Sequence, residues 1–434
     1  MRWVMMLSVG VGVVLGCGGG VLGQGYSWQR AQARVVGTGD LAWSPRAFVY
    51  EAGREVRYID YAEGDDANAG TRAAPWRHHP WDPQAKGKAA AAAGSAGSGV
   101  DTYVFKRGVV YRGRMVARQS GKPGRPVRLT SDPTWGEGEA VICGSEQVSD
   151  WRRGGDVAEM PEREKVWVAD VDYLPRRLWM VEEDGAVRRI ALARTPNWRV
   201  SDPEEVKSEW WVWENPRWWK KANRTTQVKG RTMHLGIDTK HLTREAAYYE
   251  GAIVWSEWAI VMGTPFPTPI VAFYPEKKAI AFEGRWFGDS GQINAGNRYF
   301  LENKAQYLDA PGEFWVDRRG EGGRIYLRLP GDRDPNTVRV EAAKHYSLIE
   351  DEASANAPLR LDVIGEAGRA RVNTTGWKHA EVSGLTFRFT NAWWEYHRPP
   401  WWHKEVDNAC VRLRGSSDGV RVVNPFTGNA RPDA

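Results

Sequence analysis

The chain has 434 residues, enough for one large domain or two to three of ordinary size, and its hydrophobic content of 42% supplies a sizeable core. Its net charge of +6 is a mild excess, so an acidic partner is allowed but not required. The sequence has no phosphate-binding Walker loop, no GxGxxG after a strand and no HExxH, which disfavours nucleotide enzymes and zinc proteases of those types.

The first 23 residues have the pattern of a secretory signal. Arg2 supplies a positive charge, an apolar run follows, and small residues precede Gln24. An alternative reading is a bacterial lipoprotein box that ends at Cys17, where a lipid anchor would attach. We therefore expect a secreted, periplasmic or cell-surface bacterial protein without a transmembrane segment.

Short strands with turns dominate the first part of the mature chain. Strands are predicted around Tyr58 to Asp60 and then over residues 101–111, 127–130 and 140–142, each bounded by Gly, Pro, Asp or Asn. The acidic turn at residues 60–66 lacks the spacing of a calcium loop, so no metal site is predicted. Residues 85–99, rich in Ala, Gly and Ser, are expected to form a surface loop.

The middle of the chain alternates like strands over residues 166–198 and then becomes rich in tryptophan over 197–219. Those indoles would not share one face of a helix, so a loop or irregular insertion is predicted. Residues 242–249 form the one expected helix, with Thr243 as its N-cap.

Two similar β runs lie in residues 378–428, separated by a second tryptophan-rich stretch. Each alternates apolar residues and is bounded by Gly and Asn, which is a strand and turn pattern. Recurrence of such a unit favours coils of a parallel β-helix, while an ordinary β-sandwich remains the alternative.

Several segments together resemble secreted right-handed parallel β-helix proteins of the pectin-lyase-like superfamily. The opening segments read DYAEGDDANAGT, DTYVFKRGVVYRG, SDPTWGEGEAVI and GSEQVSDW. Two later ones, PRRLWMVEEDGAVRRIALARTPNW and NRYFLENKAQYLDAPGEFWVDRRGEGGRIYLRLPG, resemble the β-helix glycoside hydrolases in particular. The resemblance extends from Arg57 to the C-terminus, and residues 197–219 fit it poorly.

The resemblance implies an all-β fold, a right-handed parallel β-helix that is incomplete at the C-terminus and carries an inserted irregular or β subdomain. The expected parts are a signal peptide (1–23), an N-terminal cap with the first coils (24–150), an inserted tryptophan-rich subdomain (151–296), and a return segment with further coils (297–434). The coils that carry the family's catalytic carboxylates would follow the matched region, so the chain is expected to be a fragment or to have lost catalysis.

Residues 391–414 form the densest candidate site, because a loop between two coils would project where the related families bind sugars. Indoles can stack on sugar rings, and charged groups can bind hydroxyls or carboxylates. The expected substrate-binding residues are Trp393, Trp394, His397, Trp401, Trp402 and Lys404. The expected catalytic residues are His403, Glu405, Asp407 and Arg412.

Three functions remain open at this point. A polysaccharide glycoside hydrolase needs two carboxyl groups, for which Glu405 and Asp407 are the local pair. A lyase that acts on an acidic glycan needs a base and a cation, for which His403 or Lys404 and Arg412 are available, and it could require calcium. The third is a non-catalytic glycan-binding or cell-surface protein.

Cofactors and partners are few in this reading. Apart from the lyase's calcium, no cofactor is expected, and Cys143 and Cys410 lack metal-ligand spacing and are predicted to be buried thiols. The expected partner is a polysaccharide rather than a nucleic acid, and the protein is expected to be a monomer.

Overall fold

The computed structural model divides the chain into two units, Met1–Ala47 and Phe48–Ala434. It describes residues 33–35, 37–39, 41–43, 49–93, 99–197, 208–216, 221–258, 261–283, 293–355, 375–391, 409–413 and 415–423. Within the first unit, β1 (Ala33–Val35) pairs antiparallel with β2 (Leu41–Trp43). The expected signal and its Cys17 lie outside the described residues.

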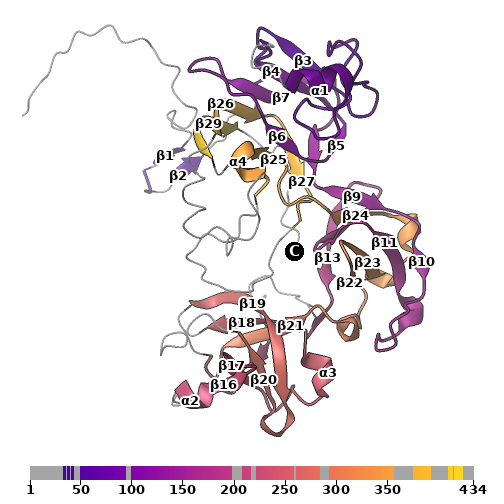
Figure 1. Ribbon diagram of the computed structural model, residues 1–434, viewed down its shortest axis with the longest axis vertical. Coiled ribbons are helices and arrows are strands. Elements are labelled where there is room, and N and C mark those ends of the chain that lie inside the picture. Colours follow the sequence, from indigo (N-terminus) through magenta and orange to yellow (C-terminus); the bar gives the residue numbers. More distant parts are fainter. Residues whose placement is uncertain are drawn as a thin grey trace, which may run out of the picture. The chain divides into compact units, whose positions relative to one another are not determined.

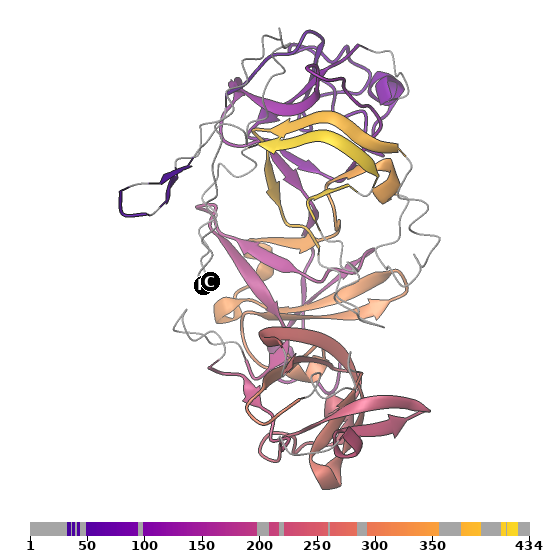
Figure 2. The ribbon, with the colours of Figure 1, turned by 90° about the vertical axis from the view of Figure 1, so that its left-hand side faces the viewer.

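The second unit contains a five-stranded sheet in which every pair is parallel. Its order is β29-β26-β7-β4-β3. The strands are β3 (Val56–Ile59), β4 (Thr102–Arg107), β7 (Val127–Gly136), β26 (Thr375–Ser383) and β29 (Ser416–Val423). Figures 1 and 2 show β26 and β29, from the last part of the chain, side by side.

Two three-stranded sheets are also wholly parallel. One is β27 (Thr386–Arg388), β8 (Val141–Cys143) and β5 (Val110–Arg112); the other is β28 (Val411–Arg412), β25 (Ile349–Asp351) and β6 (Met115–Ala117). The chain visits the three sheets in turn, through β4, β5 and β6 and later through β26, β27 and β28. Side chains of all three sheets share one core, which includes Tyr103, Ile142, Ile349 and Val382.

Between β8 and β25 the chain builds a largely antiparallel eight-stranded sheet around a second core that includes Phe314, Ile325 and Val340. Only its β13–β22 pair is parallel. In sheet order the strands are β10 (Arg152–Arg153), β11 (Trp167–Val171), β23 (Gly322–Arg328), β22 (Glu313–Arg319), β13 (Val187–Leu192), β12 (Leu178–Val181), β24 (Arg339–Ala343) and β9 (Ser145–Val148).

A second antiparallel eight-stranded sheet follows in the same part of the chain. Its strands are β14 (Arg194–Thr195), β21 (Arg298–Glu302), β18 (Ile253–Trp258), β19 (Val261–Tyr274), β20 (Ala279–Phe282), β17 (Arg231–Ile237) and β16 (Thr225–Val228), with β15 (Trp211–Val212) beside β21. Trp213, from the tryptophan-rich segment, is buried and stacks on Tyr299 with ring centroids 3.5 Å apart. At least this indole therefore belongs to the hydrophobic core.

Helices are few and short in the described residues. They are α1 (Gly87–Ala93), α2 (Lys221–Arg224), α3 (Ala246–Tyr249), α4 (Glu352–Ala355) and the 3-10 turns η2 (Arg163–Lys165), η4 (Pro275–Lys277), η5 (Ala305–Tyr307), η6 (Pro330–Asp332) and η7 (Pro335–Thr337). Within the described ranges, none is long and apolar enough to cross a membrane.

Two predictions about helices were wrong. Within the segment expected to be a loop at 85–99, Gly87–Ala93 form α1, because alanine has the highest helix propensity and Ala89 buries its side chain. The expected helix at 242–249 begins only at Ala246, with Glu245 at its N-cap and without a side-chain cap. The preceding residues are held instead by Asp238, which accepts the backbone N–H of His241 at 2.9 Å.

The prediction of an all-β protein is confirmed. The finer prediction of a parallel β-helix is not established, because most strand pairs in the described residues are antiparallel. The physical reason is the segment between β8 and β25, whose hairpins form both eight-stranded sheets. The parallel pairs are concentrated in the three smaller sheets.

Candidate functional site

Nine of the ten expected site residues lie outside the described residues. They are Trp393, Trp394, His397, Trp401, Trp402, His403, Lys404, Glu405 and Asp407. The tenth, Arg412 on β28, is buried, and its Nη1 lies 3.2 Å from Glu350 Oε1 and 2.9 Å from the Ser354 carbonyl. The structure thus places Arg412 in an internal ion pair, and the predicted site as a whole stays a prediction.

A different group of polar side chains comes together where the parallel strands meet the antiparallel sheet of β9 and β24. We call it the junction cluster and define it by Tyr61, Asp82, Arg112, Glu146 and Glu341. Tyr61 follows β3, Asp82 precedes α1, and Arg112 ends β5. The two glutamates lie on β9 and β24, which pair antiparallel in the register Ala342 opposite Glu146.

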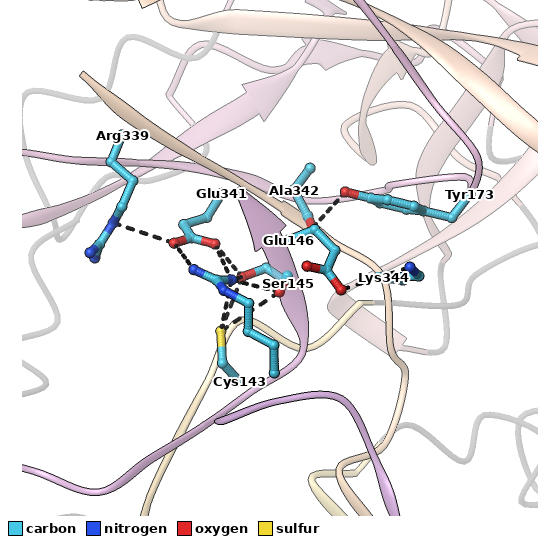
Figure 3. Close-up of polar contacts among 9 residues, drawn as sticks. Cys143, Ser145, Glu146, Tyr173, Arg339, Glu341, Ala342 and Lys344 are labelled. Atoms are coloured by element: carbon cyan, nitrogen blue, oxygen red, sulfur yellow. Dashed lines mark hydrogen bonds and ion pairs between the residues drawn. The ribbon is translucent and has the colours of Figure 1, made fainter. Parts of the chain in front are cut away.

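The ion pair between Arg112 and Glu341 anchors the cluster, and Glu341 is labelled in Figure 3. Arg112 Nη1 and Nη2 each donate to one oxygen of Glu341 at 2.8 Å, which is the bidentate geometry of strong charge-assisted hydrogen bonds. Ser145 Oγ donates to Glu341 Oε2 at 2.7 Å, and Arg339 lies 3.3 Å from Glu341 Oε1. All the acceptor capacity of this buried carboxylate is engaged locally, so Glu341 is a structural group.

Two turns hold the Asp82 side of the cluster in place. Asp66 accepts the backbone N–H of His78 at 2.8 Å, contacts His78 Nδ1 at 2.8 Å and accepts the N–H of Lys86 at 2.9 Å. Burial opposes ionisation of Asp66, but these hydrogen bonds outweigh it and lower the pKa of its carboxyl. A charged Asp66 therefore orients the His78 ring, which meets Tyr61 edge-on at 5.3 Å.

A small cavity of about 20 Å³ lies beside these groups, with Tyr61, Asp82 and Arg112 among its lining residues. A space of this size holds about one water molecule. Gly113, with φ of +133°, lines it as well, and a Cβ there would come within 3.3 Å of Asp82 Oδ2. Glycine at this position therefore leaves space beside Asp82 Oδ2 that a side chain would reduce.

The two other carboxyl groups of the cluster, Asp82 and Glu146, have different surroundings. Burial raises the pKa of Asp82, although the N–H of Gln84, which it accepts at 2.8 Å, opposes the shift. Glu146 is only partly buried, and its Oε1 lies 3.7 Å from Lys344 Nζ. The pKa of Tyr61 is also raised, mainly by burial and then by the negative charges of Asp82 and Glu146. Both carboxyls therefore act on this one phenol.

Aromatic rings and cations border the two carboxyls. The guanidinium of Arg77 lies 5.6 Å from the centre of the Tyr61 ring, and Lys344 Nζ lies 5.2 Å from that of Tyr173. Tyr173 is fixed by donating to the Ala342 carbonyl at 3.3 Å (Figure 3). Half-buried tyrosines next to carboxyls and cations suit a ligand with apolar faces and many hydroxyls.

The described residues contain no group of three His, Cys, Asp or Glu arranged to hold a metal ion. Cys143 lies under the cluster with its Sγ 3.1 Å from Ser145 Oγ, and burial raises the pKa of its thiol. Cys143 and Cys410 are free, and Cys410 is partly exposed rather than buried as predicted.

Sequence reasoning did not single out Asp82 or Glu146. Asp82 stands in a Pro-rich turn after His78, His79 and Trp81, and Glu146 is one polar residue in an alternating strand. The acidic turn near Asp66 could have pointed to Asp82, since Asp66 accepts the backbone N–H groups of His78 and Lys86 on either side of it. That turn gives no signal for Glu146.

Comparison with known proteins gives distant matches. No family model matches the chain, and no curated protein matches it. One similar solved structure is described as a glycoside hydrolase, with 15% sequence identity, a TM-score of 0.47, and coverage of 78% of this chain and 51% of the other. Another is a complex of XylC with xylose, with 15% identity, a TM-score of 0.32, and coverage of 77% and 35%. The chain thus spans about half and about a third of these two proteins.

Proposed function

We propose that this protein is a carbohydrate-active protein of the glycoside hydrolase type, and that its parallel strands are coils of a right-handed parallel β-helix. The three all-parallel sheets support the second part of this proposal, because the chain enters them in a repeated order and they enclose a common core. Short turns between β4, β5 and β6 fit one coil of such a repeat.

The observation that carries the functional part is the pair of unlike carboxyls in the junction cluster. Glycoside hydrolysis uses one carboxyl that gives a proton to the leaving oxygen and a second that attacks the sugar or activates water. A carboxyl whose burial favours the protonated form is suited to the first of these roles. Asp82 is the proposed acid because burial raises its pKa. Glu146, next to Lys344, is the proposed nucleophile or base.

The surrounding groups would position the sugar. Tyr61 lies beside both carboxyls, and its raised pKa keeps the phenol protonated as a hydrogen-bond donor. Tyr173 offers a second ring near Lys344. We also retain the proposal that Trp393, Trp394, Trp401 and Trp402 border the sugar-binding surface, on the strength of their sequence pattern alone.

Product analysis tests this function. Purified protein is incubated with a panel of neutral and acidic polysaccharides, and the products are assayed for new reducing ends and for the ultraviolet absorbance of unsaturated uronates. Reducing ends without that absorbance support a hydrolase. Reducing ends with it identify a lyase, and binding without any cleavage identifies a non-catalytic glycan-binding protein. Either of the last two results contradicts the proposal.

A further inference from the structure

A second, larger cavity of about 140 Å³ lies in the antiparallel sheet that contains β13 and β22, apart from the lining of the junction-cluster cavity. Arg176 precedes β12, Asn303 follows β21, and Arg318 lies on β22. On the scale of about 10–15 Å³ for one water-sized group, the cavity accommodates about ten such groups, which is the size of one sugar ring with its substituents.

The cavity wall is held in position by hydrogen bonds to buried groups. Asn391 is 2% exposed, accepts the backbone N–H of Arg176 at 3.0 Å and donates to the Leu174 carbonyl at 3.1 Å. On the other side, Asn303 adopts a left-handed backbone with φ of +72° and donates its N–H to the Ala193 carbonyl at 3.1 Å. These hydrogen bonds fix the backbone at Arg176 and Asn303, which reduces the entropy that this part of the wall would lose on ligand binding.

The polar lining is basic. Arg176 and Arg318 line the cavity. Arg177 follows Arg176 in the chain. Its pKa is lowered, mainly by burial and then by the positive charge of Arg189. Two acids are adjacent in sequence to lining residues. Burial raises the pKa of Glu302, before Asn303, to about 7, while the charges of Arg194, Arg189 and Arg176 act against that shift. Asp317, before Arg318, pairs with Arg319 at 3.1 Å. The two ionisable side chains among the lining residues are therefore both guanidinium groups.

The remaining lining is apolar and lies beside the two guanidinium groups. Leu174, Leu192 and Val316 provide this surface, and Asn303 adds an amide. A guanidinium pairs with a carboxylate through two parallel hydrogen bonds, and apolar side chains contact the C–H face of a sugar ring. The lining thus matches a pyranose that carries a carboxylate.

We propose that this cavity binds one uronic acid unit, with its carboxylate on Arg176 and Arg318 and its ring against Leu174, Leu192 and Val316. This inference rests on the proposed carbohydrate function and narrows the substrate class to acidic glycans. It assigns recognition alone to the cavity, with no chemical step.

Calorimetric titration of the whole chain with D-glucuronate, and with D-glucose as the uncharged counterpart, tests the proposal. Glucuronate is expected to bind at least about tenfold more tightly than glucose, since hydrogen bonds to a charged group are among the stronger ones. Arg318→Gln should weaken glucuronate binding about tenfold or more. Arg319→Gln is the matched control, because it makes the same charge change on β22 at a residue that pairs with Asp317 at 3.1 Å outside the cavity lining.

Three results would overturn the proposal: no glucuronate binding, equal binding of glucose, or equal weakening by both substitutions. Circular dichroism of each variant verifies folding, and Arg176→Gln gives a second variant if Arg318→Gln is unfolded. The outcome is separable from the hydrolase proposal. Hydrolysis of a neutral glycan without glucuronate binding refutes only the proposal that the cavity binds a uronic acid. Glucuronate binding without any glycan cleavage refutes only the proposal that the protein is a hydrolase.

Discussion

Replacing Arg112 by Met should destabilise the protein strongly, because it would leave Glu341 as a buried charge with too few partners. The Glu341 side chain is 1% exposed and receives both of its shortest ion-pair contacts from Arg112, each at 2.8 Å. Only Ser145 and the longer contact to Arg339 would remain. Breaking a buried pair from one side costs about 3–5 kcal/mol. We expect the free energy of unfolding to fall by about that amount.

Urea unfolding followed by tryptophan fluorescence measures this loss. Arg339→Met is the matched control, because this 41% exposed side chain touches the same carboxylate at 3.3 Å, and exposed pairs contribute about 0–1 kcal/mol. The double variant Arg112→Met, Glu341→Leu should recover much of the stability, since it removes both buried charges. If Arg112→Met costs no more than the control, or if the double variant recovers nothing, Glu341 is not held as a buried charge.

Three further predictions concern other parts of the chain. Burial raises the pKa of Glu313 to about 8 from an ordinary 4.5, so between these pH values the folded state keeps a proton that the unfolded state releases. This group should therefore lower the free energy of unfolding by about 1.4 kcal/mol for each pH unit of increase in that range. Urea unfolding at a series of pH values should show a weaker dependence of stability on pH in Glu313→Gln. Trp402→Ala should weaken glycan binding about two- to tenfold, the equivalent of about 0.5–1.5 kcal/mol, with little change in melting temperature. A large loss of Tm with unchanged binding would instead show that this indole belongs to the hydrophobic core. Intact mass of exported protein should place the first residue at Gln24, or at a lipidated Cys17, and a product that retains residues 1–23 would contradict secretion.

The short strands of the parallel sheets were predictable from local pattern. Alternating apolar residues between Gly, Pro and Asn marked the segments that become β3, β4, β7 and β8, and later β26 and β29. In each, inward side chains such as Tyr103 and Val382 enter the common core. Period-two alternation bounded by turn residues carries this information without any knowledge of strand partners.

Pairing and the candidate site depend on contacts that the local pattern does not encode. The alternation over 166–198 indicates strands but not their partners. Glu341 reaches Arg112 because β24 pairs with β9, and β8, which comes just before β9, pairs with β5. The placement of both Asp82 and Glu146 close enough to Tyr61 to act on its phenol has the same long-range origin. Arg412 stood in a charged stretch that suggested exposure, yet its guanidinium is buried against Glu350 because β28 pairs in parallel with β25.

The most direct test of the proposed function is the rate of glycan hydrolysis by Asp82→Asn and Glu146→Gln, compared with Glu137→Gln, a matched change at an exposed turn residue. We expect kcat/KM to fall by about 10²–10⁴-fold in both site variants and to stay unchanged in the control. In the unsubstituted protein, activity should decline as pH rises through the raised pKa of Asp82, because the proposed acid must be protonated. Undiminished hydrolysis by Asp82→Asn or by Glu146→Gln, with an unaltered pH profile, would contradict the assignment of the active site to the junction cluster.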